Sequence, residues 1–132
     1  MQKKKIILGV APTKRSFLSM EEAVRQKERF MAVIRNTLSA SVEIVDIDDI
    51  SETGICWNMD ETRRIIEKFR TAGIDALFIP FCDFGEEQVA AAIASGFHLP
   101  VLIWGASDER PNSDTIRGRD TQCGMFAATT VL

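Results

Sequence analysis

The stretch that decides the fold is Ile74-Asp75-Ala76-Leu77-Phe78-Ile79-Pro80-Phe81-Cys82-Asp83-Phe84-Gly85-Glu86-Glu87. It opens as a continuous apolar run, which is typical of a strand buried on both faces of a parallel sheet. Pro80 is expected to end this strand because it has no N–H to donate. Asp83 as N-cap, with Glu86 three residues later, predicts a helix directly after the turn. The turn therefore lies at the carboxyl end of a central strand, where ligands bind in open α/β sheets.

The rest of the chain repeats this unit. Further apolar stretches predict three more strands, at residues 5–11, 42–47 and 99–104. Helical spacing of apolar residues predicts helices at residues 20–38, between Asn58 and Gly73, at 86–95 and from about 120, where the chain is expected to stop inside a helix. A long surface loop is predicted at 106–118 from its polar composition.

This order of strands and helices predicts the fold class. Strands that alternate with helices require right-handed crossovers and a parallel sheet. We expect an α/β, three-layer Rossmann/flavodoxin-like fold: a four-stranded parallel sheet of order 2-1-3-4, covered by helices on both faces. A crevice is predicted between the first and third strands, at their carboxyl ends.

Composition excludes several classes of protein. The 132 residues suit one domain, and the net charge of −3 argues against a nucleic-acid partner. No run approaches the roughly 20 apolar residues of a membrane span, so no membrane partner is expected. Three cysteines without close pairing indicate reduced thiols, and one histidine makes a zinc site improbable. We expect a cytoplasmic protein.

The loops predicted at the carboxyl ends of the strands carry the candidate site. They combine hydrogen-bonding groups, one cationic segment and aromatic side chains, which suits a small polyol. Each residue also has a commoner structural role: Asp83 as a helix cap, Trp104 in the sheet core, and Arg119-Asp120 as a local ion pair with an N-cap. The candidate substrate-binding residues are Thr13, Lys14, Arg15, Cys82, Asp83, Phe84, Asp108 and Arg119.

Other chemistries have weaker support. No Gly-x-Gly-x-x-Gly follows the first strand, so a dinucleotide site is disfavoured. Cys82 at a helix N-terminus could have a lowered pKa, yet no histidine base lies near it in the sequence. No residue of the chain is therefore assigned a catalytic or metal-binding role.

Two stretches suggest a family. Residues 80–87, and residues 99–105 continuing to Arg119-Asp120-Thr121-Gln122-Cys123-Gly124, resemble the N-terminal domain of L-fucose isomerase-like and L-arabinose isomerase-like sugar isomerases. The resemblance implies aldose–ketose isomerisation by a full-length enzyme with a divalent cation, usually manganese. In that family the cation is held by acidic residues and a histidine of later domains, and no residues here match them.

The resemblance also implies a role for this domain. It contributes sugar-binding surface in such enzymes, often to the active site of a neighbouring subunit, so a homo-oligomer is expected. The matching positions are residues 13–15 and 82–84, and Cys82 stands where the fucose enzymes have a tryptophan, which leaves the sugar open.

The family's polypeptides are much longer than this chain. We therefore expect either a fragment of a multidomain chain or a stand-alone relative without the catalytic domains, inactive by itself. Two alternatives stay open at this point: a free-standing small-ligand-binding or regulatory module with a flavodoxin-like fold, and a thiol enzyme that uses Cys82.

Overall fold

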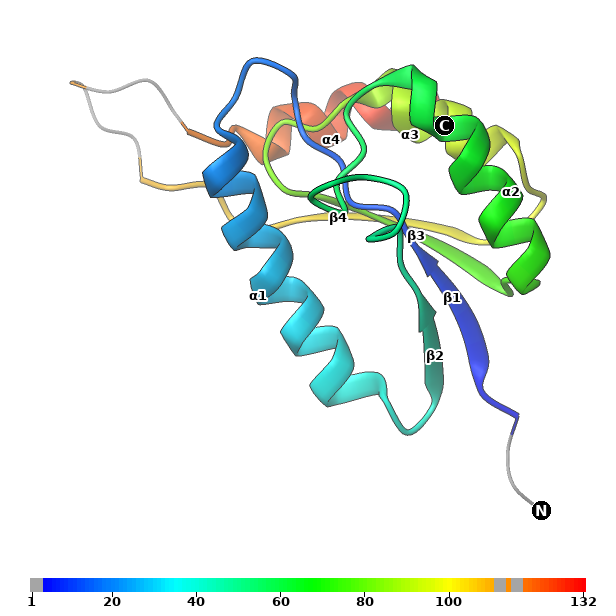
Figure 1. Cartoon of the computed structure of the whole chain (residues 1–132). Helices are drawn as coiled ribbons and strands as arrows, with labels where there is room; N and C mark the ends of the chain where they lie inside the picture. Colours follow the sequence, from blue (N-terminus) through cyan, green and yellow to red (C-terminus); the bar gives the residue numbers. More distant parts are fainter. Residues whose placement is uncertain (1–3, 111–113, 115–117) are drawn as a thin grey trace.

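A computed structural model describes residues 4–110, 114 and 118–132, and its elements follow the predicted order (Figure 1). The strands are β1 (Ile6–Val10), β2 (Val42–Val45), β3 (Ala76–Phe81) and β4 (Val101–Gly105). The helices are α1 (Met20–Leu38), the 3₁₀ helix η1 (Met59–Glu61), α2 (Thr62–Ala72), α3 (Glu87–Ser95) and α4 (Thr121–Thr129). All strand pairs are parallel and the order is β2-β1-β3-β4, which confirms the predicted fold class. The loop predicted at 106–118 lies partly outside the described residues.

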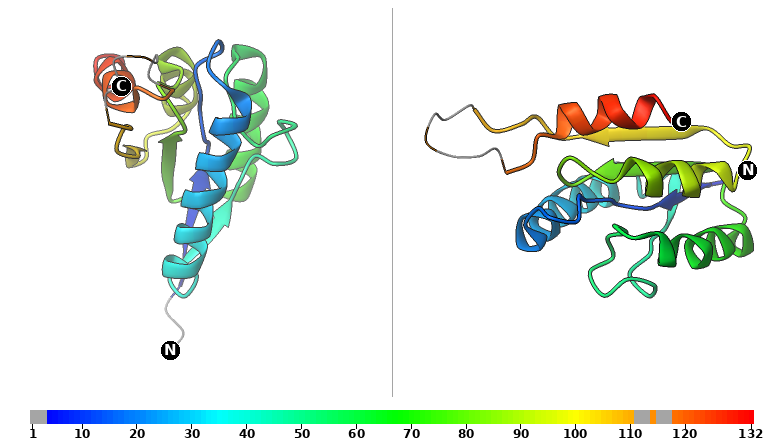
Figure 2. Two further views of the ribbon diagram at one scale, coloured as in Figure 1. Left: turned by 90° about the vertical axis from the view of Figure 1, so that its left-hand side faces the viewer. Right: turned by 90° about the horizontal axis from the view of Figure 1, so that it is seen from above.

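The two faces of the sheet carry different numbers of helices (Figures 1 and 2). Helices α2, α3 and α4 cover one face, and each adds a buried residue to its core: Phe69, Ile93 and Ala128. Of the helices in the described residues, α1 is the one that covers part of the other face, where Phe30 packs in one core with Phe78 of β3. No helix in the described part of the chain is long and apolar enough to cross a bilayer.

Short-range hydrogen bonds set several of the helix ends. The Ser19 hydroxyl accepts from the N–H of Glu22 at 3.2 Å and caps α1. The Asn58 side chain accepts from the N–H of Glu61 at 3.3 Å and caps η1. Gly73 ends α2 with φ of 65°, a left-handed conformation that glycine adopts without a steric penalty. These predicted caps are confirmed.

Two predicted element ends are wrong. Pro80 does not end β3: it pairs in register with Trp104, and the strand continues to Phe81. Pro80 has no N–H to donate, but its carbonyl still accepts from the N–H of Thr13 at 3.0 Å, so pairing with the segment after β1 continues past the proline. At the other end of the chain, α4 ends at Thr129 rather than continuing through the last residue.

Asp83 does not cap α3. The helix begins at Glu87, and Glu86, the residue before it, makes no capping bond with its side chain. Instead, Oδ1 of Asp83 accepts from the N–H of Arg15 at 2.7 Å and of Gly85 at 2.9 Å. This carboxylate therefore joins the turn after β3 to Arg15, 68 positions away in the sequence, rather than capping α3.

Candidate functional site

The segments that follow β1 and β3 stay side by side beyond the strands. The carbonyl of Thr13 accepts from the N–H of Cys82 at 2.9 Å, and the carbonyl of Pro12 accepts from the N–H of Cys56 at 2.8 Å. Thr13 thus forms bridges to both Cys56 and Phe81. The structure brings the 13–15 and 82–84 loops together, but hydrogen-bonded backbone fills the position where the open crevice was predicted.

Half of the predicted site residues lie inside the protein. The Thr13 hydroxyl accepts from the N–H of Glu86 at 3.2 Å. The Lys14 ammonium donates to the carbonyls of Arg15 at 2.5 Å and Leu18 at 2.9 Å. The Thr13 side chain thus links the loop after β1 to the start of α3, and the Lys14 side chain holds that loop in its own conformation. The buried residues, each 1% exposed or less, are Thr13, Lys14, Cys82 and Asp83.

Burial changes the titration of these groups. It lowers the pKa of Lys14 and raises the pKa of Asp83, although the N–H groups of Gly85 and Arg15 oppose the second shift. Burial also raises the pKa of Cys82, the opposite of the lowered pKa considered for a thiol at a helix N-terminus. A buried thiol with a raised pKa is a poor nucleophile, which argues against the thiol-enzyme alternative.

Arg15, Glu86 and Glu87 are charged groups of this rim that reach the surface. Its Nη1 lies 2.8 Å from Glu86 and its Nη2 lies 2.6 Å from Glu87, while the guanidinium carbon sits 4.4 Å from the centre of the Phe84 ring. The Arg15 side chain is 16% exposed. We call Arg15, Phe84, Glu86 and Glu87 the Arg15 cluster. It places one cation between two carboxylates, on an aromatic face.

Three residues of this rim are absent from the candidates that the sequence predicts. The sequence pattern predicts Glu86 and Glu87 as the first turn of a helix, but two acids directly after a strand–turn segment can equally bind a cation from another loop. Trp57, in the loop after β2, is exposed, and the Lys14 ammonium lies 5.9 Å from its ring centre. A tryptophan in a loop expected at the rim was the available signal.

Asp108 and Arg119 lie in the segments after β4 and before α4. The Asp108 carboxylate accepts from the N–H groups of Thr121 at 2.7 Å and Gln122 at 3.2 Å, and so it caps α4. Arg119 forms an ion pair with Glu109 at 3.2 Å. Among the described residues, neither side chain bonds to the Arg15 cluster, so the structure does not bring all eight candidates together.

Helix α4 packs closely against the 82–84 turn at a glycine, Gly124. A Cβ added at Gly124 would lie 1.6 Å from the carbonyl oxygen of Phe84, so only glycine allows this approach. Gly85 turns the chain with φ of 74°, and a Cβ there would meet the Phe81 ring. The Arg119–Gly124 segment and the Phe84–Gly85 turn are therefore parts of one packing unit.

The rim does not fit a metal ion. Across the described residues, no group of His, Cys, Asp and Glu side chains is arranged to hold one. Asp83 accepts from two backbone N–H groups, and Glu86 and Glu87 hold the Arg15 guanidinium, which repels a cation. The manganese ion implied for a full-length enzyme therefore has no ligand set at this rim.

Comparison with known proteins bears on this geometry. The matching family model is the N-terminal domain of fucose/sulfoquinovose isomerase, and the match covers residues 9–132. No curated protein and no solved structure matches the chain. The matched range contains both rim loops and confirms the resemblance to fucose isomerases. The chain belongs to the fucose/sulfoquinovose isomerase family, as an N-terminal domain.

Proposed function

We propose that the rim at the carboxyl ends of β1, β2 and β3 contacts the sugar substrate of an aldose–ketose isomerase. The divalent cation and the acid–base groups belong to another part of the enzyme in this proposal. The protein is a cytoplasmic homo-oligomer, and the rim completes an active site of a neighbouring subunit. Family membership and the Arg15 cluster support this proposal.

The Arg15 cluster is the observation that carries the proposal. A guanidinium has more N–H donors than its two bonds to Glu86 and Glu87 use, and each carboxylate keeps acceptor capacity. Such a group can donate to one sugar hydroxyl and accept from the next. The exposed rings of Phe17 and Trp57, in the loops after β1 and β2, offer apolar surface to the C–H face of a sugar.

The charge of the rim favours a neutral sugar portion over a sulfonate. Lys14 is buried and its ammonium is committed to two carbonyl groups. Two carboxylates already balance the one charge of Arg15. A sulfonate placed here meets net negative charge, so this domain is suited to the hydroxylated part of the substrate.

The test is the kinetics of Arg15→Ala in the whole enzyme. Loss of a hydrogen bond to a charged group costs about 1.5–3 kcal/mol, so we expect KM for fucose to rise about ten- to a hundredfold. The turnover number should change less, because a contact remote from the reacting carbons stabilises ground state and transition state alike.

The control is Arg70→Ala, which removes an exposed arginine in the last turn of α2, at the end of the sheet opposite the rim. It should leave KM unchanged. An Arg15→Ala enzyme that folds normally, as judged by its melting temperature, and keeps the parent KM would disprove the sugar contact. The domain alone, residues 1–132, is expected to turn over no sugar.

A further inference from the structure

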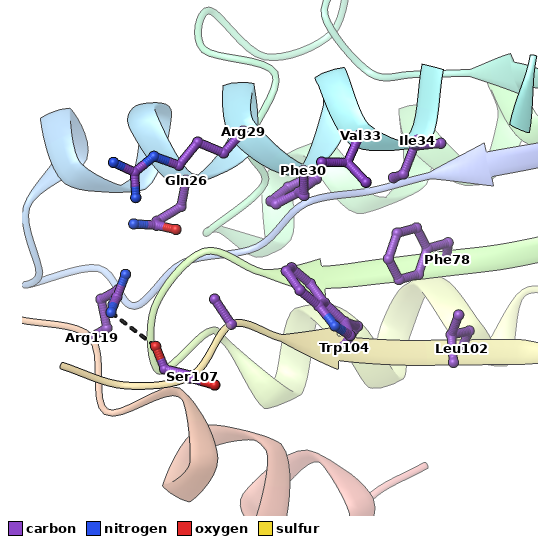
Figure 3. A pocket seen from close by; sticks show the side chains of 11 residues that line it. Gln26, Arg29, Phe30, Val33, Ile34, Phe78, Leu102, Trp104, Ser107 and Arg119 are labelled. Carbon is purple, nitrogen blue, oxygen red and sulfur yellow. Dashed lines mark hydrogen bonds between the residues drawn. The ribbon is translucent and has the colours of Figure 1, made fainter. Parts of the chain in front are cut away.

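A groove of about 590 Å³ lies between α1 and β4, on the face of the sheet that α2, α3 and α4 do not cover (Figure 3). Leu102 is 61% exposed, and Trp104 is 40% exposed although its ring packs edge-on against Phe30 with 5.9 Å between ring centres. Single exposed apolar residues are ordinary, but a contiguous set marks an interaction surface. Apart from Ala106, the apolar lining consists of Phe30, Val33, Ile34, Phe78, Leu102 and Trp104.

The groove adjoins an unpaired strand edge. Strand β4 is the last strand of the sheet in the described residues, with β3 as its one neighbour. The N–H of Leu77 donates to the carbonyl of Pro100 at 2.9 Å. The alternation of a parallel ladder then turns the N–H groups of Val101 and Ile103 away from β3. These outward N–H groups and the apolar groove form one continuous surface at the edge of the domain.

The path of α4 indicates which element suits this surface. The helix starts beside Gly105, at the carboxyl end of β4, and runs back towards the amino end of that strand (Figure 2). A right-handed crossover from there places a further parallel strand beside β4. A helix that follows this strand lies on the other face, next to α1, in the doubly wound arrangement of such sheets.

The charge of the groove also favours a helix next to α1 that begins at the carboxyl end of β4. Its polar residues, Gln26, Arg29, Ser107 and Arg119, lie at the carboxyl end of β4, where a helix after a parallel strand begins (Figure 3). Arg29 is exposed and forms no ion pair within the described residues. The N-terminus of a helix is itself positive, so a helix that starts beside Arg29 requires acidic residues in its first turn.

We propose that the β4 edge and the groove bind a β-strand followed by an amphipathic helix from the part of the isomerase outside this N-terminal domain. That helix is acidic in its first turn and apolar on the side that faces Leu102 and Trp104. A second copy fits less well, because two-fold pairing of β4 edges is antiparallel and sets the cationic end of one groove against the apolar end of the other. This inference rests on the family membership and is independent of the sugar contact.

Amide hydrogen exchange in residues 1–132 and in the whole isomerase tests the proposal. A partner strand accepts from the outward N–H of Ile103, so we expect this amide to exchange at least about tenfold more slowly in the whole enzyme. If the Ile103 amide exchanges equally fast in the whole isomerase and in residues 1–132, the proposal is overturned. Protection within residues 1–132 that grows with protein concentration also overturns it, because the occupant is then a second copy.

Two substitutions in the whole enzyme sharpen this result. Leu102→Glu places a charge in the groove and should displace the partner strand. The Ile103 amide should then exchange at least about tenfold faster than in the parent enzyme. Phe126→Glu is the matched control, since Phe126 is 65% exposed on α4, on the opposite face. It should leave the exchange of Ile103 unchanged, and equal effects of the two substitutions would contradict the groove as the docking surface.

Discussion

The two faces of the sheet differ in how completely they are covered. On one face, Phe69 of α2 and Ile93 of α3 are fully buried in a core with Leu77 and Ile79 of β3. On the other, α1 covers the middle of the sheet, and Leu102 and Trp104 of β4 remain exposed. Both sets of side chains are apolar, so the sequence pattern does not separate them. The helices that lie over a strand decide which of its residues are buried.

The largest expected effect is a difference in stability loss when one aromatic residue on each face is replaced by alanine. Phe69→Ala should lower the free energy of unfolding by about 3–5 kcal/mol, because it leaves a cavity in a closed core. Trp104→Ala should cost only about 1 kcal/mol, mainly the edge-to-face contact with Phe30. Urea denaturation of residues 1–132 measures both, and equal losses would contradict the difference between the faces.

The helix caps give a smaller effect, with one cap for each face. Asp108→Ala removes the side chain that caps α4, and Ser19→Ala removes the cap of α1. Each substitution should cost about 0.5–2 kcal/mol, because it leaves helix N–H groups without an acceptor. Thermal unfolding followed by circular dichroism measures the losses. If Asp108→Ala changed nothing, a group other than Asp108 would hold the start of α4.

The smallest expected effect concerns the rim, where the loops from both faces meet. Burial raises the pKa of Asp83, so the stabilisation from its protonated form is complete below the unfolded pKa of about 3.9 and is lost as the pH rises through the folded pKa. Asp83→Asn keeps the oxygen that accepts from Arg15 and Gly85 but does not titrate. The variant should therefore gain stability relative to the parent as the pH rises above about 4.

Denaturant titrations of the two proteins at several pH values measure this difference. A stability difference that stayed constant with pH would show that Asp83 titrates alike in the folded and unfolded chain. Either result leaves the sugar contact of Arg15 untouched, because that contact is tested by KM.

The sequence predicted the caps at Ser19 and Asn58 correctly, but the caps predicted at Asp83 and Asp120 are wrong, since neither side chain caps the helix that follows it. Ser19 and Asn58 each bond to an N–H three residues away, so a local pattern contains both partners. Asp108 bonds to Thr121, 13 positions away, and Arg15 bonds to Glu86, 71 positions away. A pattern within a few residues cannot distinguish a carboxylate that caps its own helix from one that holds a distant loop.

The sequence by itself determined the order and type of the elements, the parallel sheet and the family, because these follow from apolar periodicity, short-range caps and a few motif residues. Only the tertiary structure decided that Lys14 and Cys82 are buried and that Arg15 lies between two glutamates. It also decided that β4, among the described residues, has one strand neighbour and an apolar groove beside its other edge. These features depend on which segments the crossovers bring into contact, and contacts between segments far apart in the chain leave no periodic signal in either one.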